Sequence, residues 1–265
     1  MLLGVALLAM PIQAFAAGRY PNAMASTGDS ITRAFNTGFF PFTDNAGGSW
    51  STGTNSTVAS HYTRLLALNP KIRGKNYNDA RSGAKMQDLA GQMTTVNTRK
   101  VGYVTVLMGG NDVCTPSEST MTSVADFEAQ FTAAMNTLTS GSPSAQIFVA
   151  TIPDVYQLWL IEKGNLSART TWGLFSVCQS MLANPLSTDE ADIDRRQRVR
   201  QREIDFNDAL LRVCAAYRQC RSDNGAVFNT AFTAADVSTR DYFHPSLAGQ
   251  AKLAAGTWAV SYWGP

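Results

Sequence analysis

Only two histidines occur in the chain, and one of them lies close behind an aspartate. A serine hydroxyl attacks an ester carbonyl efficiently only when a base takes its proton and a third group orients that base. His244 follows Asp241 by three residues in a loop, so one loop can present both groups. A neutral imidazole, with a pKa near about 6.5, can accept the serine proton at neutral pH. The spacing therefore predicts His244 as a base and Asp241 as the acid that orients it.

Ser30 is the candidate nucleophile. It lies in the turn Gly28-Asp29-Ser30, directly after a short and mostly apolar run over residues 23–27 that is typical of a strand. Such a turn lifts a hydroxyl out of the packed layer. The other histidine, His61, lies inside an amphipathic helical pattern beside Tyr62, with no flanking carboxylate. We therefore interpret His61 as a structural or surface residue.

The same reaction needs hydrogen-bond donors for the oxyanion that develops on the carbonyl oxygen, and each well-placed donor contributes roughly 2.7–4 kcal/mol. Gly83 can offer its backbone N–H at close approach because it lacks a Cβ. Asn111, which follows a compact buried strand over residues 103–108, can add a side-chain N–H. Ser30 can add its own amide.

Four segments in this order resemble the conserved blocks of the GDSL/SGNH hydrolase family. The resemblance implies that Ser30 is the nucleophile, with His244 and Asp241 completing a triad, and that Ser30, Gly83 and Asn111 form the oxyanion hole. The first block ends in Ile31 where the family name has leucine. The blocks are Gly28-Asp29-Ser30-Ile31, Asn78-Asp79-Ala80-Arg81-Ser82-Gly83, Gly109-Gly110-Asn111-Asp112 and Asp241-Tyr242-Phe243-His244. Two further stretches, 49–53 and 109–114, resemble the phospholipase B branch of the family.

The hydrophobic pattern alternates between strands and helices, which indicates a parallel sheet covered on both sides. The family's fold agrees with it: a flavodoxin-like, three-layer α/β/α sandwich with five parallel strands. We expect strands over 23–27, 75–80, 103–108, 146–152 and 226–229, and helices over 56–68, 86–96, 123–138, 199–213 and 247–258. The segment 154–193 is expected to be an irregular insertion, either a wall or lid of an acyl site or a surface excursion pinned by Cys178.

The first residues resemble a secretory leader. An apolar run over 2–9 precedes the small-x-small pattern of residues 14–16, although no Lys or Arg follows Met1. The run is shorter than the about 20 residues that a membrane-spanning helix needs. We therefore predict a signal peptide over 1–16, a single domain over 17–265, and secretion to the extracellular space or the periplasm.

The four cysteines fit an exported protein with two disulfides. Three pairings are open in principle. Cys214 and Cys220 are close enough to close a small loop, which leaves Cys114 with Cys178. The four cysteines have neither the C-x-x-C spacing nor the neighbouring histidines of a metal site, and no metal or other cofactor is expected.

Charge argues against nucleic acid as a partner, because the net charge is only +2. The one basic run, over 195–202, is flanked by acidic residues and is interpreted as a solvated helix face with internal ion pairs, ahead of a phosphate-binding patch. The expected partners are a small-molecule or lipid ester and, transiently, a lipid interface, with the protein as a monomer.

The sequence thus predicts a secreted serine hydrolase of carboxylic esters, with lipid or acyl-chain esters as substrates. The phenylalanines at 35, 39, 40 and 42 either line an acyl pocket or fold into the core. Alternatives are a carbohydrate acetylesterase on the same fold and a non-catalytic lipid- or carbohydrate-binding module. An S-x-x-K motif occurs at 82–85 and an S-D-N motif at 222–224, but the K-T-G motif that accompanies them in β-lactamases is absent from the sequence. The G-x-S-x-G motif is absent as well, which argues against an α/β-hydrolase.

Overall fold

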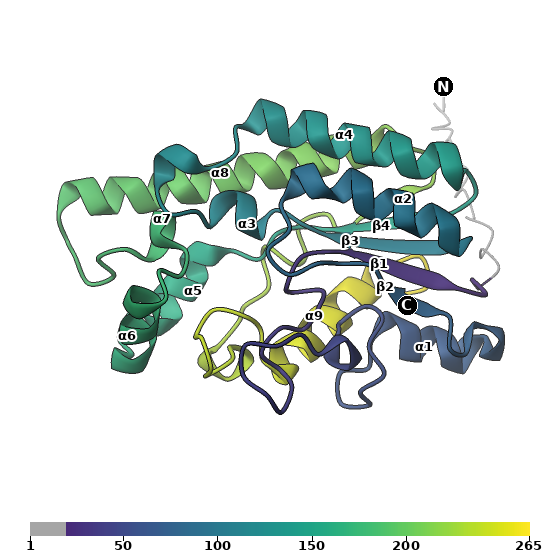
Figure 1. Ribbon diagram of the computed structural model, residues 1–265, viewed down its shortest axis with the longest axis horizontal. Helices are drawn as coiled ribbons and strands as arrows, with labels where there is room; N and C mark the ends of the chain where they lie inside the picture. The colour runs from purple at the N-terminus through teal and green to yellow at the C-terminus, as the bar shows by residue number, and fades with distance from the viewer. Residues whose placement is uncertain (1–19) are drawn as a thin grey trace, which may run out of the picture.

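A sheet of five parallel strands forms the middle layer of the molecule (Figure 1). The computed structural model describes residues 20–265, so the proposed leader over 1–16 lies outside the described residues. The strand order is β2-β1-β3-β4-β5, as expected for a flavodoxin-like sheet. The strands are β1 (Met24–Gly28), β2 (Asn76–Asn78), β3 (Tyr103–Leu107), β4 (Gln146–Ala150) and β5 (Cys220–Ser222).

Helices cover both faces of this sheet, which gives the predicted three layers. In Figure 1, α2, α4 and α8 lie on one face and α1 and α9 on the other. The helices are α1 (His61–Leu68), α2 (Leu89–Arg99), α3 (Gly110–Val113), α4 (Val124–Gly141), α5 (Val155–Glu162), α6 (Leu166–Leu174), α7 (Gln179–Leu182), α8 (Glu190–Ala215) and α9 (Leu247–Ala259). Single 3-10 turns occur at Ala46–Gly48, Pro70–Ile72, Met86–Asp88, Glu118–Thr120 and Ala234–Asp236.

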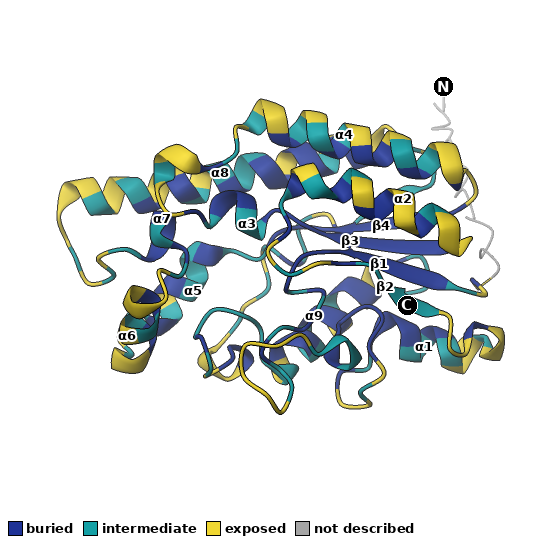
Figure 2. Cartoon of the chain, viewed as in Figure 1, coloured by how far each residue is buried: buried dark blue, intermediate teal, exposed yellow. Residues whose placement is uncertain are grey.

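Two hydrophobic cores lie on the two faces because successive strand side chains point in opposite directions. Val104 and Ile147 join the core under α2, α4 and α8, where Phe127 stacks on Phe206 at 4.0 Å between ring centroids. Tyr103 and Phe148 join the other core, under α1 and α9. Every residue of β1 and β3 is buried, and Figure 2 shows most of the exposed residues on the outer faces of the helices and in loops. Parallel strands that are buried along their whole length in this way need cover on both sides.

The helices begin at residues that satisfy their first backbone N–H groups. Ser60, Ser123 and Ser246 cap α1, α4 and α9, each accepting the N–H three residues further on. The cap at Ser60 explains why α1 is shorter than the predicted helix over 56–68, since the chain before the cap runs through turns.

The last strand is misplaced in the sequence prediction. Residues 226–229 do not form it, and the edge strand β5 is instead the polar segment Cys220–Ser222, paired with β4. The apolar segment turns because the carboxylate of Asp223 accepts the backbone N–H groups of Gly225 and Val227. The composition of this segment is apolar, as in a strand, because its Val227 packs in the core under α1 and α9.

The segment 154–193 is not irregular, which corrects the prediction. It forms the three helices α5, α6 and α7 and the first turn of α8. Polar capping residues interrupt its hydrophobic periodicity: the side chains of Asp154 and Asn165 accept N–H groups in the first turns of α5 and α6.

Two disulfides form between the cysteines. Cys178 is bonded to Cys114, and Cys214 is bonded to Cys220, which is the pairing that the sequence spacing favoured.

The basic run of α8 differs from the predicted solvated face. Arg195 pairs with Asp192 inside the helix, but Arg198 pairs with Glu118 and Arg200 with Asp154, so the run fastens α8 to other segments.

Between residues 20 and 265, no helix combines the length and the apolar character that crossing a membrane requires.

Candidate active site

The strand order reverses between β1 and β3, and the segments that follow these two strands open a crevice at the carboxyl edge of the sheet. β1 ends at Gly28, whose φ of +140° is open to glycine alone, and a Cβ there would lie 2.1 Å from the carbonyl oxygen of Leu107. The side-chain amide of Gln92 accepts from the Gly28 N–H and donates to its carbonyl. The turn that presents Ser30 is thereby fixed against α2, a contact that sequence reasoning missed.

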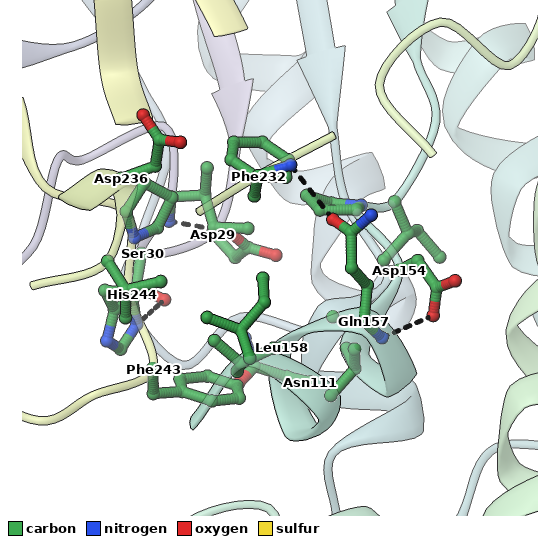
Figure 3. A pocket seen from close by; sticks show the side chains of 18 residues that line it. Asp29, Ser30, Asn111, Asp154, Gln157, Leu158, Phe232, Asp236, Phe243 and His244 are labelled. Carbon is green, nitrogen blue, oxygen red and sulfur yellow. Dashed lines mark hydrogen bonds between the residues drawn. The ribbon is translucent and has the colours of Figure 1, made fainter. Parts of the chain in front are cut away.

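Ser30, His244 and Asp241 lie in one hydrogen-bonded line. The Oγ of Ser30 is 2.7 Å from Nε2 of His244, and Nδ1 of His244 is 2.6 Å from Oδ2 of Asp241. Figure 3 shows Ser30 and His244 together on one side of a cleft. The His244 side chain is 14% exposed, so a substrate can reach the ring. Segments 214 positions apart thus meet with the spacing that proton transfer from serine to imidazole requires.

Asp241 is held as a carboxylate by its donors. Burial alone would raise its pKa, but the hydrogen bond and charge of His244, the His244 backbone N–H and the amide of Asn36 outweigh burial, so the pKa of Asp241 lies below its ordinary value. An ionised Asp241 can fix the tautomer of His244 that leaves Nε2 free to accept a proton.

Asn111 is the second residue of the short helix α3 and lines the same cleft. Gly109, with φ +127°, precedes it because a Cβ there would lie 2.5 Å from Cδ1 of Ile152. The Asn111 amide donates one N–H to the carbonyl of Ala84 at 3.0 Å, which leaves its second N–H for another acceptor. This bond also ties the loop after β2 to α3.

Gly83 lies in that loop, with φ +79°, but it does not line the cleft. Among residues 20–265, the backbone N–H groups of Gly83 and Ser30 donate no hydrogen bond. The structure therefore brings Ser30, Asn111 and His244 to the lining of one cleft, and Gly83 is not part of that lining. The role of Gly83 as an oxyanion donor stays a prediction.

Asp29 is a buried carboxyl next to Ser30 in the chain. One oxygen accepts the N–H of Ile31 at 2.9 Å, and the other, Oδ2, has no partner among the described residues. Burial raises the pKa of Asp29 to about 6, against the lowering effects of the Ile31 N–H and the charge of His244.

The cleft next to Ser30 is walled by apolar side chains from three parts of the chain. The segment after β1 supplies Ile31, and α5 supplies Leu158 and Ile161. In Figure 3, Leu158 lies between the Ser30–His244 pair and Gln157, whose side-chain oxygen accepts the backbone N–H of Phe232. The remaining apolar lining consists of Ile152, Pro153, Val155, Phe232, Val237, Phe243 and Pro245.

Three of the four phenylalanines that follow Ser30 neither line the cleft nor fold into the core. Phe39, Phe40 and Phe42 are exposed at 88%, 67% and 52%, and Phe42 packs on Phe175, which is itself exposed. Only Phe35 turns inward, with its ring 4.9 Å from that of His244. The phenylalanines that line the cleft, at 232 and 243, come from the end of the chain and were missed.

The sequence model of the GDSL-like lipase/acylhydrolase family matches residues 26–256, so the protein belongs to this family. It is accordingly an ester hydrolase. A search of curated protein sequences found no match.

Solved structures share the fold at low sequence identity. A GDSL-like lipase candidate from Parabacteroides merdae is 16% identical, covers 90% of this chain and 94% of its own, and superposes with a TM-score of 0.54. An extracellular lipase from Streptomyces rimosus is 18% identical over 87% and 95% of the two chains, with a TM-score of 0.50. A family 3 carbohydrate esterase from Clostridium thermocellum is 14% identical over 89% and 92%, with a TM-score of 0.51.

Proposed function

We propose that this hydrolase cleaves carboxylic esters with apolar acyl chains through an acyl-enzyme on Ser30. The observation that carries the proposal is the 2.7 Å contact between Ser30 Oγ and His244 Nε2 at the wall of an apolar cleft. A hydroxyl, an imidazole and an ionised carboxylate in line are what nucleophilic attack on an ester needs.

In the first half-reaction, Ser30 Oγ attacks the ester carbonyl carbon while His244 Nε2 takes the serine proton. The negative charge on the carbonyl oxygen receives N–H donors from the Asn111 side chain and from the Ser30 and Gly83 backbones. Collapse of this intermediate expels the alcohol, which takes the proton from His244. Water then attacks the acyl-enzyme by the same route and releases the carboxylic acid.

The cleft lining supports the choice of acyl group. A hydrocarbon chain gains roughly 0.8 kcal/mol for each CH₂ that it buries, and aliphatic and aromatic side chains form most of the cleft. An acetyl group would leave most of this surface without a partner. The same reasoning ranks lipid esters ahead of acetylated carbohydrates.

A panel of acyl p-nitrophenyl esters, phospholipids and acetylated sugars tests this assignment. We expect kcat/KM to rise with acyl length and then level off. Leu158→Trp, which fills the cleft, should move the preference to shorter chains, whereas Leu160→Trp is the matched control, because Leu160 lies on the same helix, is 47% exposed and does not line the cleft. Preference of the wild type for acetylated sugars would favour the carbohydrate acetylesterase, and no turnover at all would favour a binding module.

We further propose that the protein is exported and works at a lipid surface. Two disulfides support an oxidising compartment. The exposed phenylalanines at 39, 40, 42 and 175 support transient contact with lipid, because apolar side chains such as Phe can be buried at the boundary between headgroups and acyl chains. Sedimentation with phosphatidylcholine vesicles should be lost in Phe39→Ser/Phe40→Ser while hydrolysis of a soluble ester is retained.

A further inference from the structure

Asn36 is a buried polar side chain that contacts the triad from outside the four sequence blocks. It is 3% exposed and lies six residues after Ser30, in the turn that follows the nucleophile. Its Nδ2 donates to Oδ2 of Asp241, across a separation of 205 residues. Its backbone has φ +63°, a left-handed conformation in which asparagine is enriched.

The orientation of the Asn36 amide follows from what faces each end. Oδ2 of Asp241, a carboxylate oxygen, requires a donor, and the backbone N–H of Phe42 on the other side requires an acceptor. Only one placement of Nδ2 and Oδ1 satisfies both neighbours. The side chain therefore links the triad acid to the loop that carries the exposed phenylalanines.

The other donors to Asp241 all come from its own turn. Oδ1 accepts the backbone N–H groups of Phe243 and His244, and Oδ2 accepts Nδ1 of His244. Among the described residues, Asn36 is the only donor to Asp241 from another part of the chain. These local bonds shape the turn, but they do not fix where the turn sits relative to Ser30.

A second bond strengthens the junction between the two segments. The hydroxyl of Ser238 donates to the backbone carbonyl of Asn36 at 3.2 Å. On the nucleophile side, the N–H of Phe35 donates to the carbonyl of Ser30, so Asn36 belongs to the same hydrogen-bonded turn as the nucleophile. The contact between Ser30 and His244 and the contact between Asn36 and Asp241 thus run in parallel between the same two turns.

We propose that Asn36 is a positioning residue, which holds the Asp241–His244 turn at the distance from Ser30 that catalysis requires. The proposal rests on the proposed function of Ser30, His244 and Asp241. It also connects the Asp241–His244 turn to the backbone of Phe42, because the same side chain accepts the Phe42 N–H. Asn36 does not line the cleft, so its effect falls on turnover and not on substrate binding.

Asn36→Asp isolates the bond to the triad. Aspartate has the same size, tolerates the left-handed backbone and keeps an acceptor for Phe42, but it places a second carboxylate against Asp241. Two carboxylates in contact bind one proton between them, and that proton restores a donor. The matched control is Asn45→Asp, because Asn45 lies nearby and donates to Thr37, away from the triad.

For Asn36→Asp we expect kcat on a soluble short-chain ester to fall roughly 10- to 100-fold at about pH 8, the loss of one hydrogen bond to a charged group, with KM within about twofold. The ratio of variant to wild-type kcat should rise as the pH is lowered to about 5.5, because the shared proton returns. Asn45→Asp should show neither effect. Asn36→Gly, which keeps the backbone conformation and removes both bonds, should be slower without this recovery in acid.

Labelling of Ser30 by a fluorophosphonate probe supplies a readout that needs no ester substrate. The rate of labelling should fall in Asn36→Asp as kcat does. This expectation holds even if the wild type hydrolyses none of the esters tested. In that case the proposed substrate is wrong, and the positioning role of Asn36 can still be tested. Equal labelling and turnover in Asn36→Asp and Asn45→Asp would overturn the positioning role. A loss in Asn36→Asp that did not vary with pH would overturn it as well.

Discussion

The two histidines of the chain lie in opposite environments. His61 is fully buried at the start of α1, where its ring nitrogens pair with the hydroxyls of Tyr103 and Thr257, each at 2.9 Å. His244 lies in the loop before α9, 14% exposed, between the hydroxyl of Ser30 and the carboxylate of Asp241. One histidine joins the core, and the other reaches a cleft.

The difference shows that a carboxylate partner and access decide whether an imidazole can act as a base. Burial, with a smaller contribution from the charge of Arg64, lowers the pKa of His61 to about 3, so this ring stays neutral and cannot take a proton at physiological pH. Its neighbours are hydroxyls and aromatic rings, which give a protonated ring no counter-charge. At His244 the carboxylate of Asp241 supplies that charge.

Exchange of each histidine gives the sharpest contrast. His244→Ala should lower kcat on the order of 10⁴-fold or more, because Ser30 loses its base. His61→Gln should leave kcat within about threefold and lower the free energy of unfolding by about 1–3 kcal/mol, because buried hydroxyls lose a partner. Steady-state kinetics and urea unfolding of both variants measure these values. A large loss of kcat in a well-folded His61→Gln would contradict the comparison.

The low pKa of His61 predicts how stability depends on pH. The unfolded chain binds a proton at this histidine below about pH 6.5 and the folded chain does not until about pH 3, so the wild type loses stability at this site as the pH falls through that window. The difference in unfolding free energy between wild type and His61→Gln should therefore shrink by about 2 kcal/mol from about pH 7.5 to about pH 5. A difference that stays constant over that range would mean that His61 protonates in the folded protein.

Asp29 provides the opposite case, a buried acid beside the second histidine. Its folded pKa is raised to about 6 from 3.8, so the folded chain holds its proton more tightly and stability at this site falls as the pH rises through that window. Relative to wild type, Asp29→Asn should gain about 2 kcal/mol of unfolding free energy between about pH 4 and about pH 8. Urea unfolding at the two pH values measures the gain, and a change of opposite sign would show that Asp29 is stabilised as a carboxylate.

The sequence predicts those parts of the molecule whose signal is local. β3 and β4 are short, mostly apolar runs, and the segments around Ser30, Asn111 and His244 carry short motifs, so residue types alone locate them. The prediction for the segment 154–193 is wrong because its helices are short and capped by polar residues, which interrupts the hydrophobic periodicity. The prediction of the last strand is wrong because the three-residue edge strand β5 is specified by its pairing with β4 and not by its own composition.

Two residues that contact the site over long sequence separations could not be identified from the sequence. Gln92 clamps Gly28 from 64 positions away, and Asn36 reaches Asp241 across 205. Each is a single polar residue without a motif around it. Only the folded chain shows that these amides contact the segments that carry Ser30 and Asp241.

The most direct test of the proposed mechanism is mass spectrometry of the protein after reaction with a fluorophosphonate probe. We expect one adduct, on the peptide that contains Ser30, formed at the same rate in His61→Gln as in wild type and nearly abolished in His244→Ala. Undiminished labelling of Ser30→Ala, or labelling that depends on His61 and not on His244, would contradict the assignment of nucleophile and base.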